Sequence, residues 1–188
     1  MKNIFFNTVI SLSLLFTAII CHAVDKIQYK QTAFGISEKE FLKKFKSDNF
    51  KCESRRDGKS TFCESTIASY SNQKPTRTWA IFYQNLLYSI SIQFEFENKR
   101  DAEFKKKEIL DSLKDKFGKP LRFKNTADKV NGINLKTDEY IWANADDASL
   151  NFMATDADGF TLAKIDMKSL SILERVMNED KKSKLSDM

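Results

Sequence analysis

The sequence predicts an α+β fold in which an antiparallel sheet carries helices on one face. Segments with apolar residues at helical spacing are interleaved with segments in which apolar and polar residues alternate singly. Turn sequences such as Asp-Gly separate the expected strands. The resulting order of helix, strands, helix, strands, helix is typical of helices gathered on one face of an antiparallel sheet.

The chain begins with a segment typical of a secretory signal peptide. A basic start precedes a mostly apolar run over 4–20, and Cys21 and Ala23 supply small residues for a cleavage site. We expect cleavage between Ala23 and Val24 and a periplasmic protein without a stable transmembrane segment. Acylation of Cys21 is the minority alternative, because Ile20 stands where lipoprotein signals place a small residue. The expected parts are a signal peptide (1–23), one domain (24–180) and a frayed tail (181–188).

Cleavage would remove His22, the only histidine, together with Cys21. A chain without histidine or a free thiol cannot use Ser-His-Asp, Cys-His or histidine-zinc chemistry, so we expect no enzyme, metal or cofactor. The formal net charge of +5 is small and dispersed along the chain. It therefore does not predict nucleic-acid binding.

The first helix is predicted from a capping box at Ser37-Glu38-Lys39-Glu40. Phe41, Leu42 and Phe45 form its apolar stripe, and we expect it to end near Ser47.

A disulfide-linked hairpin should follow. Cys52 and Cys63 are the two cysteines left in an exported chain, which favours a bond between them. Asp57-Gly58 predicts a two-residue turn in which both residues take positive φ, and counting outward from it places Cys52 opposite Cys63. Directly opposed strand residues lie within disulfide reach.

Two strands are expected over 79–83 and 88–96, separated by a turn at Gln84-Asn85. In the second strand Ser89 and Ser91 belong to the predicted solvent-facing side. A loop containing Pro75 precedes these strands.

The second half repeats this outline. A helix over about 101–117 should end at Gly118 and Pro120. A polar segment containing Asn131-Gly132 then leads to a strand marked by Tyr140 and Trp142, and Asp146-Asp147 marks a turn. A strand through Leu150 and Phe152 follows, and a turn at Asp158-Gly159 separates it from a strand over 160–167. The last helix is marked by Leu170, Leu173, Val176 and Met177.

The two halves suggest tandem repeats over 34–96 and 101–168. Each contains a Trp-Ala step, Trp79-Ala80 and Trp142-Ala143, followed by a strand that begins with a leucine. Together with the disulfide near the first helix and the Gly35-Ile36-Ser37 segment, this architecture resembles the β-lactamase inhibitor protein family and the related small envelope lipoprotein fold. The second half lacks the second disulfide of that family, so its binding residues do not carry over.

Carboxylate pairs are the main remaining candidates for chemistry. Asp146-Asp147 and Asp156-x-Asp158 lie at predicted turns, and Asp156-Ala157-Asp158-Gly159 resembles part of a calcium loop. The ligand positions at either end would fall on Ala154 and Ile165, which favours a plain hairpin turn.

We therefore expect a protein that binds another envelope protein, as an inhibitor or an immunity-type antagonist of a toxin or envelope enzyme. Arg55, Arg56 and Lys59 at the tip of the disulfide-locked hairpin are the candidate binding residues, suited to an acidic partner. A solvated turn is the alternative interpretation of these three residues. The alternative function is an envelope factor that binds lipid or a small apolar ligand between sheet and helices, lined by aromatic side chains. The oligomeric state is open.

Overall fold

The computed structural model describes residues 26–71, 73–143 and 147–186. The predicted signal peptide, its cleavage site and Asp146 lie outside the described residues. The elements follow in the order α1 (Glu38–Lys44), the 3-10 helix η1 (Lys46–Asp48), β1 (Lys51–Ser54), β2 (Ser60–Ser65), β3 (Arg77–Tyr83), β4 (Leu86–Phe96), α2 (Lys99–Phe117), β5 (Arg122–Val130), β6 (Ile133–Ala143), β7 (Ala148–Ala157), β8 (Phe160–Ser169) and α3 (Leu170–Ser186).

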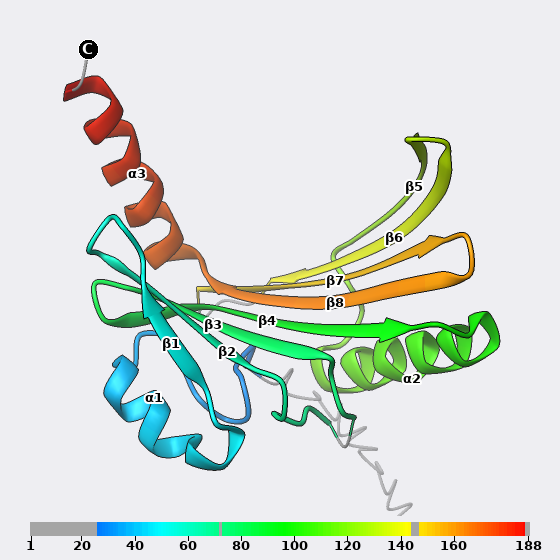
Figure 1. The fold of residues 1–188 in the computed structure, drawn as a ribbon, viewed down its shortest axis with the longest axis horizontal. Helices are drawn as coiled ribbons and strands as arrows, with labels where there is room; N and C mark the ends of the chain where they lie inside the picture. The colour runs from blue at the N-terminus through cyan, green and yellow to red at the C-terminus, as the bar shows by residue number, and fades with distance from the viewer. Residues whose placement is uncertain (1–25, 72, 144–146, 187–188) are drawn as a thin grey trace, which may run out of the picture.

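All these strands form one antiparallel eight-stranded sheet in the order β1-β2-β3-β4-β8-β7-β6-β5. Each half of the chain supplies a helix followed by a four-stranded meander, and the halves meet where β4 pairs with β8. In Figure 1, α1 and α2 lie on the same side of the sheet and α3 stands at one end of it. The predicted α+β fold is confirmed, whereas an origin by gene duplication stays a prediction.

The core lies between the sheet and the helices α1 and α2. Ala80, Ile90, Met167, Leu150 and Trp142 form one row across five neighbouring strands. Each is at most 2 % exposed. Burying a large apolar side chain contributes about 1.5–3 kcal/mol, so this covered face supplies much of the stability of the fold.

The predicted capping box starts α1. The Ser37 hydroxyl accepts a hydrogen bond from the Glu40 amide (3.3 Å), and the Ser37 amide donates to the Glu40 carboxylate (3.1 Å). Phe41 then packs its ring against Phe45 and Phe82, with centroid distances of 4.7 and 5.4 Å. This contact fixes α1 on the covered face.

The disulfide hairpin is confirmed, but its turn differs from the prediction. Cys52 pairs with Cys63 across β1 and β2, and the two are bonded with a Cα–Cα distance of 4.0 Å. Of the two turn residues, Gly58 has positive φ (62°) and Asp57 does not, and the Gly58 amide donates a hydrogen bond to the Arg55 carbonyl (3.1 Å). The register survives because Arg55 and Ser60 still pair at the end of the loop.

The polar segment around Asn131-Gly132 is a long hairpin of β5 and β6, which the sequence reading missed. Asn131 and Gly132 have φ of 50° and 85° and connect Val130 to Ile133. β5 is the last strand of the sheet and is exposed along almost its whole length. A strand with two exposed faces carries no apolar alternation, so periodicity could not reveal it.

The matching of Trp79 with Trp142 is wrong. Trp79 lies on the third strand of its meander, and Trp142 lies on the second strand of the other. They also face opposite sides, since Trp142 belongs to the buried row whereas Trp79 is half-buried on the other face. The repeat is one of topology and not of these two residues.

Helix α2 begins and ends close to the predicted positions, and α3 begins at the predicted Leu170. Gly118 (φ 73°) caps α2. Its carbonyl accepts a hydrogen bond from the Trp142 indole (2.9 Å). α3 remains helical to Ser186, over most of the segment predicted as a frayed tail. Among the described residues, no helix combines the length and apolar character needed to cross a bilayer.

Candidate functional site

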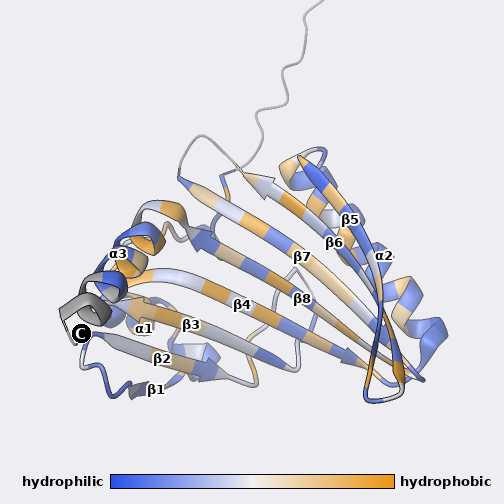
Figure 2. Ribbon diagram, turned by 90° about the horizontal axis from the view of Figure 1, so that it is seen from above, coloured by the Kyte–Doolittle hydropathy of each residue, from blue (hydrophilic) through white to orange (hydrophobic). Residues whose placement is uncertain are grey.

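The face of the sheet opposite α1 and α2 is the open face. Figure 2 looks down on it and shows the strands in view between α3 at one end and the β5–β6 hairpin at the other. One row of paired residues crosses it from β2 to β6: Glu64, Trp79, Ser91, Asp166, Asn151 and Ile141. All but Ser91 are half-buried, so the open face is a mixed polar and apolar surface in the described part of the chain.

The centre of the open face is more enclosed than predicted. Ser89 and Ser91 were expected to face solvent, but they are 2 % and 7 % exposed. Their short side chains lie between longer ones on β3 and β8, which shield them. Ser91 donates a hydrogen bond to Asp166, and Lys164 pairs with the same carboxylate at 3.0 Å. These contacts fix polar groups at the middle of the sheet.

Apolar and aromatic side chains of the open face gather toward the β1–β2 edge. Phe62 is opposite Ile81, and Glu64 is opposite Trp79, whose indole donates to the Glu64 carboxylate (3.2 Å). A surface groove along this edge is lined by Lys51, Glu53, Phe62, Glu64 and Ile67, among others. Ile67 is 55 % exposed. The groove therefore joins apolar contact area to charges of both signs.

The predicted hairpin tip adjoins this groove. A second depression is lined by Glu53, Arg55, Arg56 and Phe62, so Phe62 connects the tip to the open face. The Arg55 guanidinium lies 5.7 Å from the centre of the Phe62 ring, within the range of a cation–π contact. Arg55 and Arg56 are both exposed, and neither forms an ion pair among the described residues.

Lys59 has a different role from the two arginines. Its Nζ pairs with the Glu179 carboxylate of α3 at 2.8 Å, and the Tyr83 hydroxyl donates to the same group at 2.5 Å. The hydrogen bond and charge of Glu179 raise the pKa of Lys59, and the same contacts lower the pKa of Glu179. Lys59 thus ties the hairpin tip to α3 and leaves Arg55 and Arg56 as the outward charges.

The tip is also held internally by Asp57. Its carboxylate accepts hydrogen bonds from the Ser60 hydroxyl (2.7 Å), the Ser60 amide and the Lys59 amide. The Ser60 hydroxyl, followed by these amides, lowers the pKa of Asp57. The loop that carries the arginines is consequently ordered from both ends.

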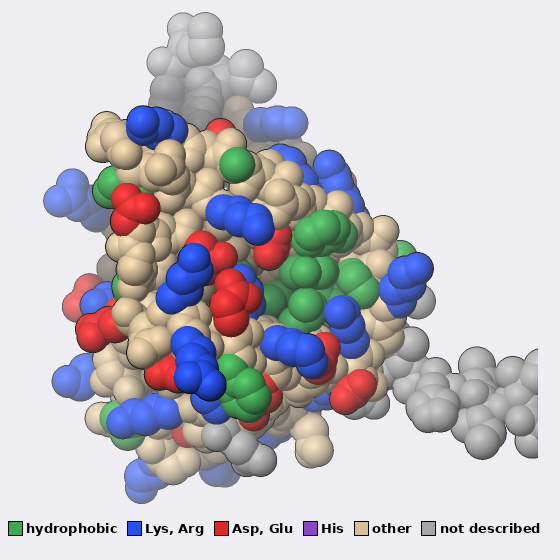
Figure 3. All heavy atoms as spheres, turned by 90° about the vertical axis from the view of Figure 1, so that its right-hand side faces the viewer, with side chains coloured by type: hydrophobic (Ala, Val, Ile, Leu, Met, Phe, Trp, Pro, Cys, Tyr) green, Lys and Arg blue, Asp and Glu red, His purple; other side chains and the backbone are tan. Residues whose placement is uncertain are grey.

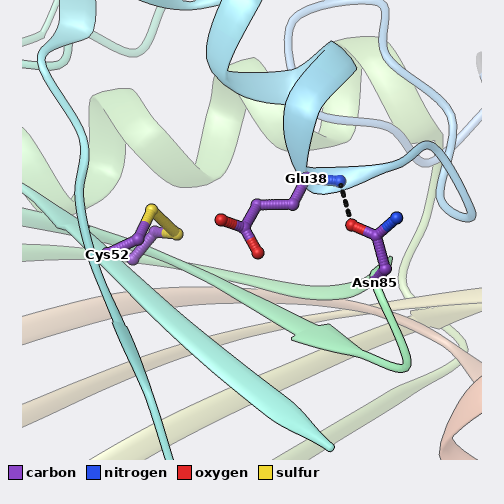
Figure 4. The surroundings of a disulfide bond; sticks show 4 residues. Glu38, Cys52 and Asn85 are labelled. Atoms are coloured by element: carbon purple, nitrogen blue, oxygen red, sulfur yellow. Dashed lines mark hydrogen bonds between the residues drawn. A yellow bond between two sulfur atoms is a disulfide. The ribbon is translucent and has the colours of Figure 1, made fainter.

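The base of the hairpin lies against the start of α1. Figure 4 shows the Glu38 side chain pointing toward the disulfide while the Glu38 amide donates to the Asn85 side chain (3.2 Å). The Glu38 carboxylate and the sulfurs of Cys52 and Cys63 lie within 4.8 Å of one another. Because the two sulfurs are bonded together, they supply no thiolate to bind a metal ion.

Two of the carboxylates singled out at turns, Asp156 and Asp147, hold parts of the fold together. Asp156 pairs with Lys106 of α2 (3.1 Å) and accepts from Thr161 (2.7 Å), while Asp158 lies in a plain β7–β8 turn. Asp147 accepts a hydrogen bond from the Ser171 amide (2.8 Å) in the first turn of α3. The contacts of Asp156 and Asp147 are therefore packing and capping contacts.

A family model described as the TP0088 domain matches residues 27–175. The chain belongs to the TP0088 domain family. The match spans the whole eight-stranded sheet and the first part of α3, so in this TP0088 domain the open face and the hairpin tip both lie within the family's extent. No curated protein and no solved structure matches the chain. The resemblance to the β-lactamase inhibitor family therefore stays a prediction.

Sequence reasoning found the basic hairpin tip but missed the surface beside it. Neither Phe62 nor Trp79 was a candidate binding residue, because strand alternation does not say which face a helix will cover. The available signal was adjacency in the sequence: Phe62 precedes Cys63 and Trp79 precedes Ala80, and successive strand residues face opposite sides of the sheet. These neighbours are fully buried, which places Phe62 and Trp79 on the opposite side.

Proposed function

We propose that this is an exported, non-enzymatic protein that binds another protein through the β1–β2 hairpin and the adjoining open face. It would act as an inhibitor or an immunity-type antagonist of a toxin or envelope enzyme. The observation that carries this proposal is the outward pair Arg55 and Arg56 beside Phe62, on a loop held at its base and at its tip.

The hairpin is ordered before any partner arrives. The disulfide joins its strands, Asp57 closes its loop, and Lys59 fastens it to Glu179 of α3. A binding loop that is already ordered loses less conformational entropy on association, so more of its contact energy appears as affinity. The same contacts hold Arg55 and Arg56 at a fixed position relative to the open face.

The residue types suit a protein interface. Arginine and aromatic residues are the side chains that most often dominate binding energy, and Arg55 with Phe62 provides both at one place. Trp79 and Ile81 extend the contact area along β3. Because the outward charges at the tip are positive, the partner should present an acidic surface or cleft there.

The alternative, an envelope factor that binds lipid, has less support. The space between the sheet and the helices is occupied by aromatic side chains. The ring centroid of Phe41 lies 4.7–5.4 Å from those of Phe45, Phe50 and Phe82. An apolar ligand would have to displace such rings. We therefore favour recognition on the outer surface.

Charge reversal tests the hairpin tip. The double variant Arg55→Glu, Arg56→Glu should lose at least about tenfold in affinity for a partner captured from envelope extract, since both charges would repel an acidic surface. The matched control is Lys39→Glu, Lys46→Glu, which changes the net charge equally at two exposed positions on the α1 side of the sheet. The control should bind like wild type.

The outcome is decided by comparing the two variants. If a partner binds and its affinity survives reversal of both arginines, the hairpin tip is not the binding site. If the control weakens binding as much as the test variant, only overall charge matters and the proposed site is wrong. Circular dichroism of each variant should match wild type, because all four side chains are exposed.

A further inference from the structure

The two edges of the sheet differ in a way that points to self-association. β1, at one edge, has four residues, whereas β5, at the other, has nine and, among the described residues, pairs only with β6. Eight of the nine residues of β5 are exposed. A long edge strand presents unpaired amides and carbonyls to any strand that can lie beside it.

Exposed apolar side chains are concentrated around the same hairpin. Leu121, Phe123, Val130 and Ile133 are 73 %, 54 %, 50 % and 45 % exposed and lie on, next to or directly across from β5. Figure 3, viewed from the β5–β6 end of the molecule, shows a hydrophobic patch bordered by lysine and arginine side chains. Phe123 contacts Tyr140 at 4.7 Å between ring centroids, on the side of the sheet where Lys114 of α2 lies over the Tyr140 ring.

The backbone of β5 has a defined outward set of hydrogen-bonding groups. Val130 and Ile133 flank a two-residue turn, so they exchange both hydrogen bonds, as do alternate pairs further along the ladder. The amides and carbonyls of even-numbered residues therefore point to β6. Those of Phe123, Asn125, Ala127 and Lys129 point outward.

We propose that β5 pairs antiparallel with β5 of a second copy of this chain, on a twofold axis at Thr126. Thr126 is the central residue of Arg122–Val130, so this register overlaps the whole strand. Lys124 then lies directly opposite the partner's Asp128, and Asp128 opposite the partner's Lys124. Opposite charges at directly opposed positions stabilise strand pairs.

Other symmetric registers fit less well. An axis at Lys124 places two lysines in direct opposition, which is destabilising. Axes at Asn125 or Ala127 shorten the overlap at both ends. In the Thr126 register no like charges are opposed, and Phe123 lies across from the aliphatic stem of the partner's Lys129 on the α2 side of the sheet.

The dimer would form one continuous sheet from two eight-stranded sheets. The hairpin tips lie at the opposite edge from β5, so both copies of the proposed binding site stay accessible at the two far ends. Self-association thus goes beyond the proposed function and does not depend on it.

Cysteine trapping tests the register. Thr126→Cys places two symmetry-related cysteines at a non-hydrogen-bonded pair, where Cα atoms are about 4.5 Å apart and can form a disulfide. Cys52 and Cys63 occupy the same kind of site at 4.0 Å. The exported, processed Thr126→Cys protein should form a covalent dimer under mild oxidation. Lys124→Cys, two residues away on the same side of the strand, should not.

Charge exchange tests the same register without cysteine. Lys124→Asp and Asp128→Lys should each weaken dimerisation at least tenfold by sedimentation over a concentration series, because each opposes like charges. The double variant should restore it. A monomeric wild type with no Thr126→Cys dimer, or a double variant that is not restored, would overturn the proposal. Partner binding by a monomeric charge variant would separate this result from the hairpin proposal.

Discussion

Reducing the Cys52–Cys63 disulfide should lower the free energy of unfolding by about 3 kcal/mol. The bond closes a loop with a sequence separation of 11 residues, and the chain-entropy relation for a loop of that size gives about 3 kcal/mol at 25 °C. This value is an upper limit, because any hairpin retained in the unfolded chain already restricts the loop. Reduction leaves the buried Cys63 side chain in place, so little packing is lost.

Urea unfolding of the same purified chain with and without a reductant measures this difference directly. A Cys52→Ala, Cys63→Ala variant is the control, and its unfolding should not respond to the reductant. The hairpin amides of β1 and β2 should also exchange faster with deuterium once the bond is reduced. A change below about 0.5 kcal/mol in the wild type would refute the loop-closure reasoning.

Three further perturbations test contacts that hold the fold and the hairpin tip in place. Trp142→Phe removes the indole donor to the Gly118 carbonyl and should cost about 1–3 kcal/mol in urea unfolding. The pKa of Asp147 is lowered, first by its hydrogen bond with the Ser171 hydroxyl. The ionised form of Asp147 therefore stabilises the fold above about pH 4. The difference in thermal stability between wild type and Asp147→Asn should become smaller as the pH falls through the lowered pKa of Asp147. Glu179→Gln should speed amide exchange in α3 and the hairpin tip. Unchanged unfolding of Trp142→Phe would contradict the first prediction, and a stability difference for Asp147→Asn that does not change with pH would contradict the second. Unchanged amide exchange in Glu179→Gln would contradict the third.

Local signals in the sequence predicted the parts of the fold that depend on neighbouring residues. The capping box at Ser37 and the glycine at Gly118 act within one helical turn, and the structure places both as expected. The β1–β2 register was predicted correctly although the turn differs, because a disulfide between Cys52 and Cys63 requires the two residues to lie opposite each other.

Features that depend on distant strands could not be predicted in this way. Periodicity shows that Trp79 and Phe62 alternate with buried residues, but only the position of α1 and α2 decides which face is open. Ser91 is buried because β8, remote in sequence, lies beside β4 and supplies Asp166. Likewise Lys59 forms an ion pair with Glu179, which is separated from it by most of the chain, so no local signal could predict this contact.

The most direct test of the proposed function is photo-crosslinking at matched phenylalanine positions. A benzophenone side chain at Phe62 lies in the surface between the hairpin tip and the open face, whereas one at Phe104 lies exposed on α2. Irradiation of the envelope should give a specific adduct with a second protein at position 62 and none at position 104. An adduct at position 104 with none at position 62 would contradict binding through the hairpin and the open face.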